Sequence, residues 1–164
     1  KAKDVKEEFG NKIEYILDGG VCTIGIESTI INLIGKPTIL RLGSLDISKI
    51  QKTLGFKINI KINPKKKIAP GQSRLHYSPG IPLEMNVTKP KNDSAFVLIR
   101  RRKTKLHNYY YISTKSDLNE AARNLYSCLR KIKSKGYKSI AVEKIPNRGL
   151  GMAINDRLYR ASKF

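Results

Sequence analysis

A short segment rich in proline and glycine divides this chain into two parts and constrains its fold most strongly. Residues 69–79 read APGQSRLHYSP. Proline fixes the backbone dihedral φ and glycine frees it, so such a segment interrupts helices and strands. It carries a guanidinium, an imidazole and a phenol, on Arg74, His76 and Tyr77, which are groups that bind anions and stack on bases. We therefore predict a linker that acts as a lid or clamp over a ligand.

Apolar periodicity on both sides of this linker predicts two units of α/β structure. In residues 1–62, predicted strands cover residues 15–17, 29–33, 38–42 and 56–62, and predicted helices cover residues 1–9 and 46–54. After a linker of residues 63–80, the alternation restarts in residues 81–164. Predicted strands there cover residues 82–87, 95–99, 109–112 and 139–142, and predicted helices run from a cap at Ser116 to Gly136 and from Leu150 to Ala161. This order indicates a small, partly parallel α/β unit.

The positive charge of the chain is strong enough to attract polyanions. Lysine and arginine outnumber aspartate and glutamate by 33 to 13, which gives a formal net charge of +20. A field of this size favours RNA, nucleotides or acidic membrane surfaces as partners. The charge is scattered except at residues 65–67 and 100–103. A dedicated nucleic-acid surface and a lysine-rich, solvated exterior both fit this pattern.

Other features narrow the class of protein. No apolar run approaches the roughly 20 residues of a membrane span, and we expect a cytoplasmic protein. Cys22 and Cys128 lie far apart in apolar surroundings, which predicts two buried free thiols in a reducing compartment. No cysteine, aspartate or second histidine has the spacing of a protein metal site around His76. The chain begins at Lys1 inside a predicted helix, so we expect it to be a piece of a longer protein.

Two polar positions within strand-like sequence are candidates for ligand binding. Residues 25–29 read GIEST, and adjacent side chains on a strand point to opposite faces. Glu27 and Thr29 therefore share one face and Ser28 lies on the other, without a nearby His and Asp for a hydrolase triad. Arg41 lies within an apolar strand, where a guanidinium needs a carboxylate, a phosphate or solvent. Both positions also fit ordinary solvent-exposed strands.

Other conspicuous segments have simpler interpretations. His107 sits in a basic loop and is expected to be solvated, and the tyrosines at residues 109–111 fit a strand packed on alternate faces better than a base-stacking platform. The glycines at 149 and 151 fall short of a phosphate-binding motif and predict a tight turn before the last helix. On that helix, residues 155–157, Asn-Asp-Arg, predict an interdomain or intrahelical polar cluster.

Several of these motifs occur together in the order typical of one family. They lie at residues 18–20, 25–30, 40–43, 69–71, 76–79, 121–125 and 149–157. Together they resemble the threonylcarbamoyl-AMP synthase family, the two-domain members of the YrdC-like group, over nearly the whole chain. The resemblance implies that residues 1–62 form the last part of a twisted YrdC-like catalytic domain. Residues 63–80 would then be the clamp, and residues 81–164 a small Rossmann-like α/β domain.

The resemblance also implies an activity and its ligands. Family members make threonylcarbamoyl-AMP from threonine, bicarbonate and ATP and release pyrophosphate, and the product feeds threonylcarbamoylation of adenosine in tRNA. By this resemblance Ser28 would bind threonine, and Arg41 and Tyr77 would bind the nucleotide. Arg74 and His76 are further candidate contacts from the linker, and no catalytic residue is identified. Mg²⁺ would accompany the ATP, with no metal site built by the protein.

The chain departs from the family pattern in three places. Proline, arginine and alanine are common where Leu42, Leu75 and Ser78 stand, and Arg74 is a candidate to replace the missing arginine. The basic patch and the Ser-x-Asn element of the family's upstream part are not in this sequence, so we expect the chain to be inactive alone. The alternative class is a non-catalytic, basic RNA- or ribosome-binding module, whose binding would fall steeply with salt.

Overall fold

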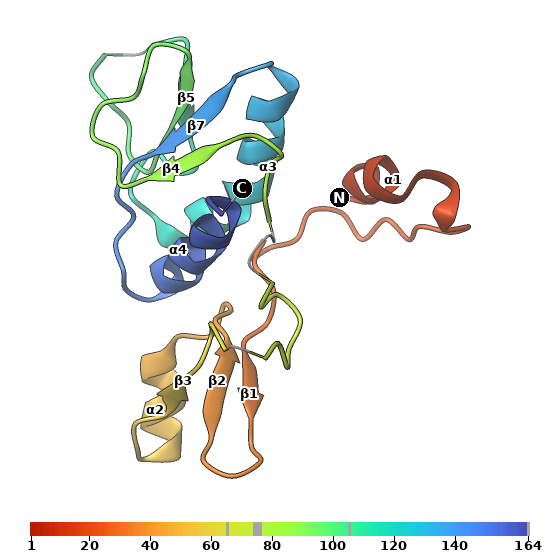
Figure 1. Ribbon diagram of the computed structural model, residues 1–164, viewed down its shortest axis with the longest axis vertical. Helices are drawn as coiled ribbons and strands as arrows, with labels where there is room; N and C mark the ends of the chain where they lie inside the picture. The colour runs from red at the N-terminus through yellow and green to blue at the C-terminus, as the bar shows by residue number, and fades with distance from the viewer. Residues whose placement is uncertain (65, 74–76, 105, 164) are drawn as a thin grey trace.

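A computed structural model describes residues 1–64, 66–73, 77–104 and 106–163, and Arg74, Leu75 and His76 lie outside the described residues. Its two sheets and surrounding helices (Figure 1) confirm the predicted α/β class. The elements are α1 (Ala2–Phe9), a 3₁₀ turn (Gly10–Lys12), β1 (Ile30–Asn32), β2 (Thr38–Arg41), α2 (Ile47–Leu54), β3 (Asn59–Ile60), β4 (Leu83–Met85), β5 (Ser94–Leu98), β6 (Tyr109–Tyr111), α3 (Leu118–Ser134), β7 (Ser139–Val142) and α4 (Leu150–Ala161). None of the described helices is long and apolar enough to cross a membrane.

The second unit is a four-stranded parallel sheet covered by two helices. The strand order is β4-β7-β5-β6, and every neighbouring pair is parallel. Helices α3 and α4 pack on one face (Figure 1) and form the main core with alternate residues of β5 and β7. Phe96, Leu98 and Ala141 form a smaller cluster on the other face. All five residues of β5 are buried, because this inner strand has an apolar cluster on each face.

The first unit is a three-stranded sheet with one helix. β1 and β2 form the predicted antiparallel hairpin, and β3 pairs in parallel with β2 after α2. The predicted helix ends are confirmed at α2. The Asp46 carboxylate accepts a hydrogen bond from the Ser48 amide at 2.8 Å, and Gly55 ends the helix with φ of 74°. Both are standard ways to satisfy the free backbone groups of a helix.

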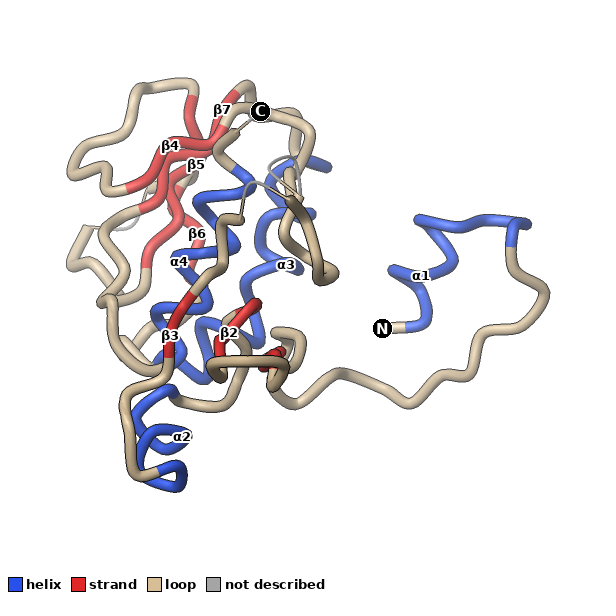
Figure 2. Tube along the Cα trace, turned by 60° about the horizontal axis from the view of Figure 1, so that its bottom comes forward, coloured by secondary structure: helices blue, strands red, loops and turns tan. Residues whose placement is uncertain are grey.

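Three local predictions differ from the structure. Residues 15–17 are not a strand, and the side chains of Tyr15 and Leu17 are 87% and 97% exposed. A β-branched or aromatic run becomes a strand only where a neighbouring strand pairs with it, and residues 13–22 instead form a loop that no described strand pairs with (Figure 2). The cap of α3 is Asp117, whose carboxylate accepts from the amides of residues 119 and 120, rather than Ser116. Cys22 is exposed rather than buried, whereas Cys128 is buried as predicted.

Candidate functional site

Arg41 and Ser28 meet at the open end of the β1–β2 hairpin. Arg41 is the last residue of β2, and in the antiparallel register it lies opposite Ile30, two residues after Ser28. The Arg41 Nε donates to the Ser28 carbonyl oxygen at 3.0 Å, and its Nη2 donates to Ser28 Oγ at 3.1 Å. The structure therefore brings together two residues that the sequence singled out separately.

The linker brings the Tyr77 hydroxyl to the same place. A methyl group added at Gly71 would lie 2.8 Å from that hydroxyl and 3.1 Å from Arg41 Cδ. Gly71 also has φ of +83°, a conformation that side-chain-bearing residues rarely adopt. Only glycine fits between the phenol and the arginine stem, so the phenol and the guanidinium lie on the same side of the molecule.

Two side chains of the second unit contact the ring of Tyr77. Its backbone φ is +66°, a left-handed conformation that costs about 1–2 kcal/mol for a residue with a side chain. The Arg157 guanidinium carbon lies 5.0 Å from the ring centroid. The Tyr126 ring of α3 stacks on Tyr77 with centroids 5.6 Å apart and planes 23° apart. These ring contacts offset the cost of the left-handed backbone at Tyr77 and keep its side chain in this position.

The environment of Tyr77 keeps its hydroxyl protonated. Burial is the largest cause that raises the pKa of Tyr77 to about 12; the Arg157 charge opposes this rise, and a hydrogen bond with Glu27 adds to it. The phenol is thus protonated well beyond neutral pH, and its single O–H donates to the Glu27 carboxylate.

Arg157 of α4 is the centre of a polar cluster that joins the two units. Its side chain is 0% exposed. Nε and Nη2 lie 3.1 and 3.0 Å from Glu27 Oε2, Nη1 donates to Asp156 Oδ2 at 2.7 Å, and Nη2 donates to the Leu42 carbonyl at 2.8 Å. The predicted polar cluster is confirmed for Asp156 and Arg157. It includes a contact within α4, between these two residues, and contacts from Arg157 to the first unit. Asn155 lies outside it and donates to the loop before α4.

Glu27 is ionised by this arrangement. Its partial burial acts most strongly and opposes ionisation, but the Arg157 charge and hydrogen bonds from a backbone amide, Tyr77 and Arg157 together hold the pKa of Glu27 below its usual range. The carboxylate thus pairs with a guanidinium that no solvent reaches.

Two further buried side chains fasten the linker to the rest of the molecule. The Gln72 amide nitrogen donates to the Leu40 carbonyl at 2.9 Å, and its oxygen accepts from the Ile68 amide at 2.9 Å. Arg160, one turn after Arg157, donates to the carbonyls of Ile62 at 2.7 Å and Ser73 at 3.4 Å. The linker is therefore anchored before and after Gly71.

Sequence reasoning missed Gln72, Arg160 and Tyr126 as parts of this site. A usable signal existed for Arg160. Asp156, Arg157 and Arg160 follow one another on a helix whose neighbours are apolar, and charged residues within an apolar helix face indicate a buried ion pair. Gln72 and Tyr126 carry no comparable signal, because their partners lie far away in the sequence.

A cavity of about 780 Å³ opens beside Tyr77. Glu27, Tyr77 and Tyr126 line it at one end, and Arg130 and Lys133 of α3 and two glutamates of α1 line the rest. Its volume is within the usual range for a small-molecule site. Neither Ser28 nor Arg41 lines this cavity, and its charged lining is three carboxylates, of Glu7, Glu8 and Glu27, and two cations, Arg130 and Lys133.

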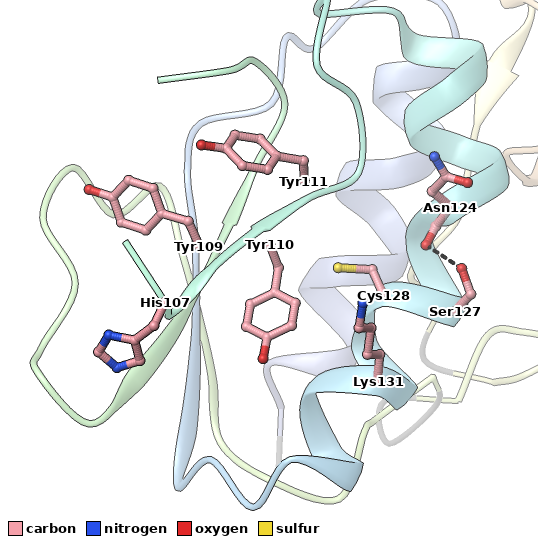
Figure 3. A pocket seen from close by; sticks show the side chains of 8 residues that line it. All are labelled: His107, Tyr109, Tyr110, Tyr111, Asn124, Ser127, Cys128 and Lys131. Atoms are coloured by element: carbon pink, nitrogen blue, oxygen red, sulfur yellow. Dashed lines mark hydrogen bonds between the residues drawn. The ribbon is translucent and has the colours of Figure 1, made fainter. Parts of the chain in front are cut away.

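A second hollow, of about 530 Å³, lies between β6 and α3 and contains none of the predicted ligand-binding residues (Figure 3). Tyr110 points toward α3 and lies edge-on to Tyr137, with centroids 5.7 Å apart. Tyr109 and Tyr111 pack on the opposite face of the sheet. This confirms the prediction that the three tyrosines belong to a strand packed on alternate faces, and His107 is exposed as expected. The described residues contain no group of three potential metal ligands.

Fold and site together define an α/β protein whose linker covers a cluster of anion-binding groups. A family described as "Threonylcarbamoyl-AMP synthase, C-terminal domain" matches residues 44–163, and one described as "Telomere recombination" matches residues 1–43. The threonylcarbamoyl-AMP synthase of Pyrococcus abyssi is 32% identical over 186 residues, which cover 99% of this chain and 53% of that protein. The synthase of Schizosaccharomyces pombe is 28% identical and is matched over 48% of its length, with 98% of this chain covered.

Solved structures agree with the sequence comparisons. The crystal structure of P. abyssi Sua5 complexed with L-threonine matches with a TM-score of 0.81 and 30% identity, over 98% of this chain and 53% of that one. The chain therefore belongs to the threonylcarbamoyl-AMP synthase family, which confirms the resemblance found in its sequence. It spans about half the length of the curated relatives that it matches.

Proposed function

We propose that this chain is the C-terminal part of a threonylcarbamoyl-AMP synthase. The complete enzyme would convert threonine, bicarbonate and ATP to threonylcarbamoyl-AMP and pyrophosphate, for the threonylcarbamoyladenosine modification of tRNA. The observation that carries this proposal is the meeting of Ser28, Arg41 and Tyr77 around Gly71, in a chain of this family. Residues 1–62 would complete a catalytic domain whose earlier part lies upstream, with residues 63–80 as clamp and residues 81–164 as C-terminal domain.

Each of the three residues has a role that suits its chemistry. Arg41 would hold the nucleotide phosphates, because a guanidinium matches their geometry and stabilises charge that develops on them. Ser28, already bonded to Arg41, would bind the threonine. Tyr77 would contact the nucleotide through its ring and its hydroxyl oxygen, because its single O–H already donates to Glu27. Arg74 and His76 are further candidate contacts from the linker to the nucleotide.

The linker would exclude water from the reaction. A carbamate intermediate is labile in water, and closing a site over such an intermediate protects it. Gln72 and Arg160 fasten this linker to β2 and α4. If the linker closes over the site, these anchored residues would stay in place. We expect Mg²⁺ to enter with the ATP phosphates and the complete enzyme to be cytoplasmic.

A non-catalytic RNA- or ribosome-binding module is the other class that the charge of +20 allows. Similarity to three threonylcarbamoyl-AMP synthases favours the enzyme. Salt separates the two functions, because binding that depends on phosphate contacts falls steeply as salt rises. A tRNA partner for the complete enzyme is compatible with either.

The proposal is tested by pyrophosphate release from a protein that joins this chain to an upstream YrdC-like part. Release should require both threonine and bicarbonate. Arg41→Ala should lower kcat/KM for ATP by roughly 100- to 1,000-fold, the usual effect of losing a donor that stabilises developing charge. Tyr109→Phe, in the hollow of Figure 3, is the matched control and should have no effect. Release that ignores threonine, or an Arg41→Ala protein with full activity, would contradict the proposal, as would turnover by the chain alone.

A further inference from the structure

One guanidinium touches the neighbourhood of all three proposed ligand-binding residues. Arg157 pairs with Glu27, which precedes Ser28 directly, and donates to the carbonyl of Leu42, which follows Arg41 directly. Its guanidinium also lies against the ring of Tyr77. A single side chain of the C-terminal domain therefore contacts Tyr77 itself and the sequence neighbours of Ser28 and Arg41.

These contacts position the residues of the proposed site more than they stabilise helix α4. Within the second unit, Arg157 contacts Asp156 of α4 and interacts with Tyr126 of α3, and its remaining contacts reach Glu27 and Leu42 of the first unit and Tyr77 of the linker. Burying an arginine in full is unfavourable, and apolar side chains of similar volume often replace buried ion pairs without loss of stability. A fork with several fixed donors does what an apolar side chain cannot, because it sets the direction of each partner.

Arg160 is a similar buried arginine on α4 that contacts the linker but not the residues beside Ser28 and Arg41. It lies on the same helix, shares the Asp156 carboxylate with Arg157, and is 3% exposed. It also donates to the backbone carbonyls of Ile62 and Ser73 and to the side-chain oxygen of Asn63, in and before the linker. Its hydrogen bonds therefore hold the linker backbone, whereas those of Arg157 reach the residues beside Ser28 and Arg41.

We propose that Arg157 is the positioning residue through which the C-terminal domain sets the geometry of Ser28, Arg41 and Tyr77. This inference rests on the proposed function and gives the C-terminal domain a defined part in it. Arg157 acts through Glu27, Leu42 and Tyr77 rather than by touching substrate. Loss of the Arg157 guanidinium should therefore lower kcat/KM for both ATP and threonine, because Arg157 contacts the sequence neighbours of both Arg41 and Ser28.

The test uses Arg157→Lys in the joined protein, because lysine keeps the charge and loses the fork. We expect kcat/KM to fall roughly 10- to 100-fold for both ATP and threonine, as small misplacements of binding groups do. Leu158→Ala is the matched control: Leu158 is the next residue on α4 and is 0% exposed in the apolar core. It should lower the unfolding temperature at least as much and leave kcat/KM unchanged where the protein stays folded.

A double-mutant cycle separates positioning from general loosening. If Arg157 acts in part through Tyr77, the double variant Arg157→Lys with Tyr77→Ala should lose less kcat/KM for ATP than the product of the two single losses. Fully multiplicative losses, or a Leu158→Ala protein as impaired as Arg157→Lys, would overturn the inference.

A measurement on the chain itself keeps this inference distinct from the proposed function. Exchange of the amide hydrogens of Tyr77, Ser78 and Gly80 should speed up in Arg157→Lys and stay near the parent rate in Leu158→Ala, whatever reaction the complete enzyme performs. Unchanged exchange in Arg157→Lys would contradict the positioning role. A joined protein that lacks threonine-dependent pyrophosphate release would instead contradict the proposed function and leave the exchange result to decide the structural claim.

Discussion

The two units of this molecule bury their apolar side chains in different ways. In the parallel-sheet unit, residues 81–163, Leu106 and Tyr159 are the exposed large apolar side chains among the described residues. In residues 1–64 many such side chains are exposed, with Leu17, Ile34 and Leu33 at 97%, 88% and 72%. The parallel sheet and its two helices supply most of the buried core, to which the first unit adds Ile26, Ile39, Leu42, Ile50 and Ile58.

The contact between the units is correspondingly polar at its centre. The guanidinium groups of Arg157 and Arg160 reach Glu27, the Leu42 carbonyl and the linker backbone. Polar junctions of this kind are common between domains of one chain. These arginine contacts join the first unit and the linker to the second unit beside a shared apolar core, and they surround the proposed site.

The largest effect that separates the two units is expected in thiol reactivity. Cys22 of the first unit is exposed, and Cys128 is buried in the second, where burial is the largest cause that raises its pKa to about 12, with Lys131 opposing. If labelling of Cys128 requires unfolding, a stability of about 5 kcal/mol slows it by roughly a thousandfold or more relative to an exposed thiol. The measurement is the rate of labelling by a disulfide reagent at pH 7, with Cys22→Ser as the control. Equal rates at the two thiols would remove the contrast between the units.

A loss of stability of intermediate size is expected when the shared carboxylate is removed. Asp156 is 3% exposed and bonds both Arg157 and Arg160. Asp156→Ala would leave two buried guanidinium groups without this partner, which costs about 3–5 kcal/mol. Urea unfolding followed by circular dichroism measures the change. Asp93→Ala, at an exposed turn, is the control and should stay within about 0.5 kcal/mol of the parent. A similarly small change for Asp156→Ala would mean that the cluster does not hold the units together.

The sequence predicted the elements of both units better than it predicted their junction. The helices at residues 46–54 and 150–161 and the β1–β2 hairpin follow from local signals, such as Asp46 as a cap and Gly55 in a left-handed conformation. Tyr15 and Leu17 looked like strand residues because a strand's partner is not visible locally. The pairing of Glu27 with Arg157 spans 130 positions, and no local pattern specifies it. The left-handed backbone of Tyr77 likewise depends on Arg157 and Tyr126.

The smallest expected effect is the pH dependence of the junction. The folded-state pKa of Glu27 is lowered from its ordinary 4.5, so its contribution to stability is complete above pH 4.5 and is lost as pH falls through the folded pKa. Its side chain is 37% exposed, so water screens the pair and the contribution is about 1 kcal/mol or less. The measurement is the difference in unfolding free energy between the parent and Glu27→Gln from pH 3 to pH 7. A difference that grows as the pH falls would contradict the pairing.

The most direct measurement of the central claim is a crystal structure of the joined protein with threonine and a non-hydrolysable ATP analogue. We predict the nucleotide between the Arg41 guanidinium and the Tyr77 hydroxyl, the amino acid within hydrogen-bond distance of Ser28 Oγ, and Arg157 still bonded to Glu27 and the Leu42 carbonyl. A nucleotide bound away from both Arg41 and Tyr77, for example in the hollow beside β6, would contradict the account.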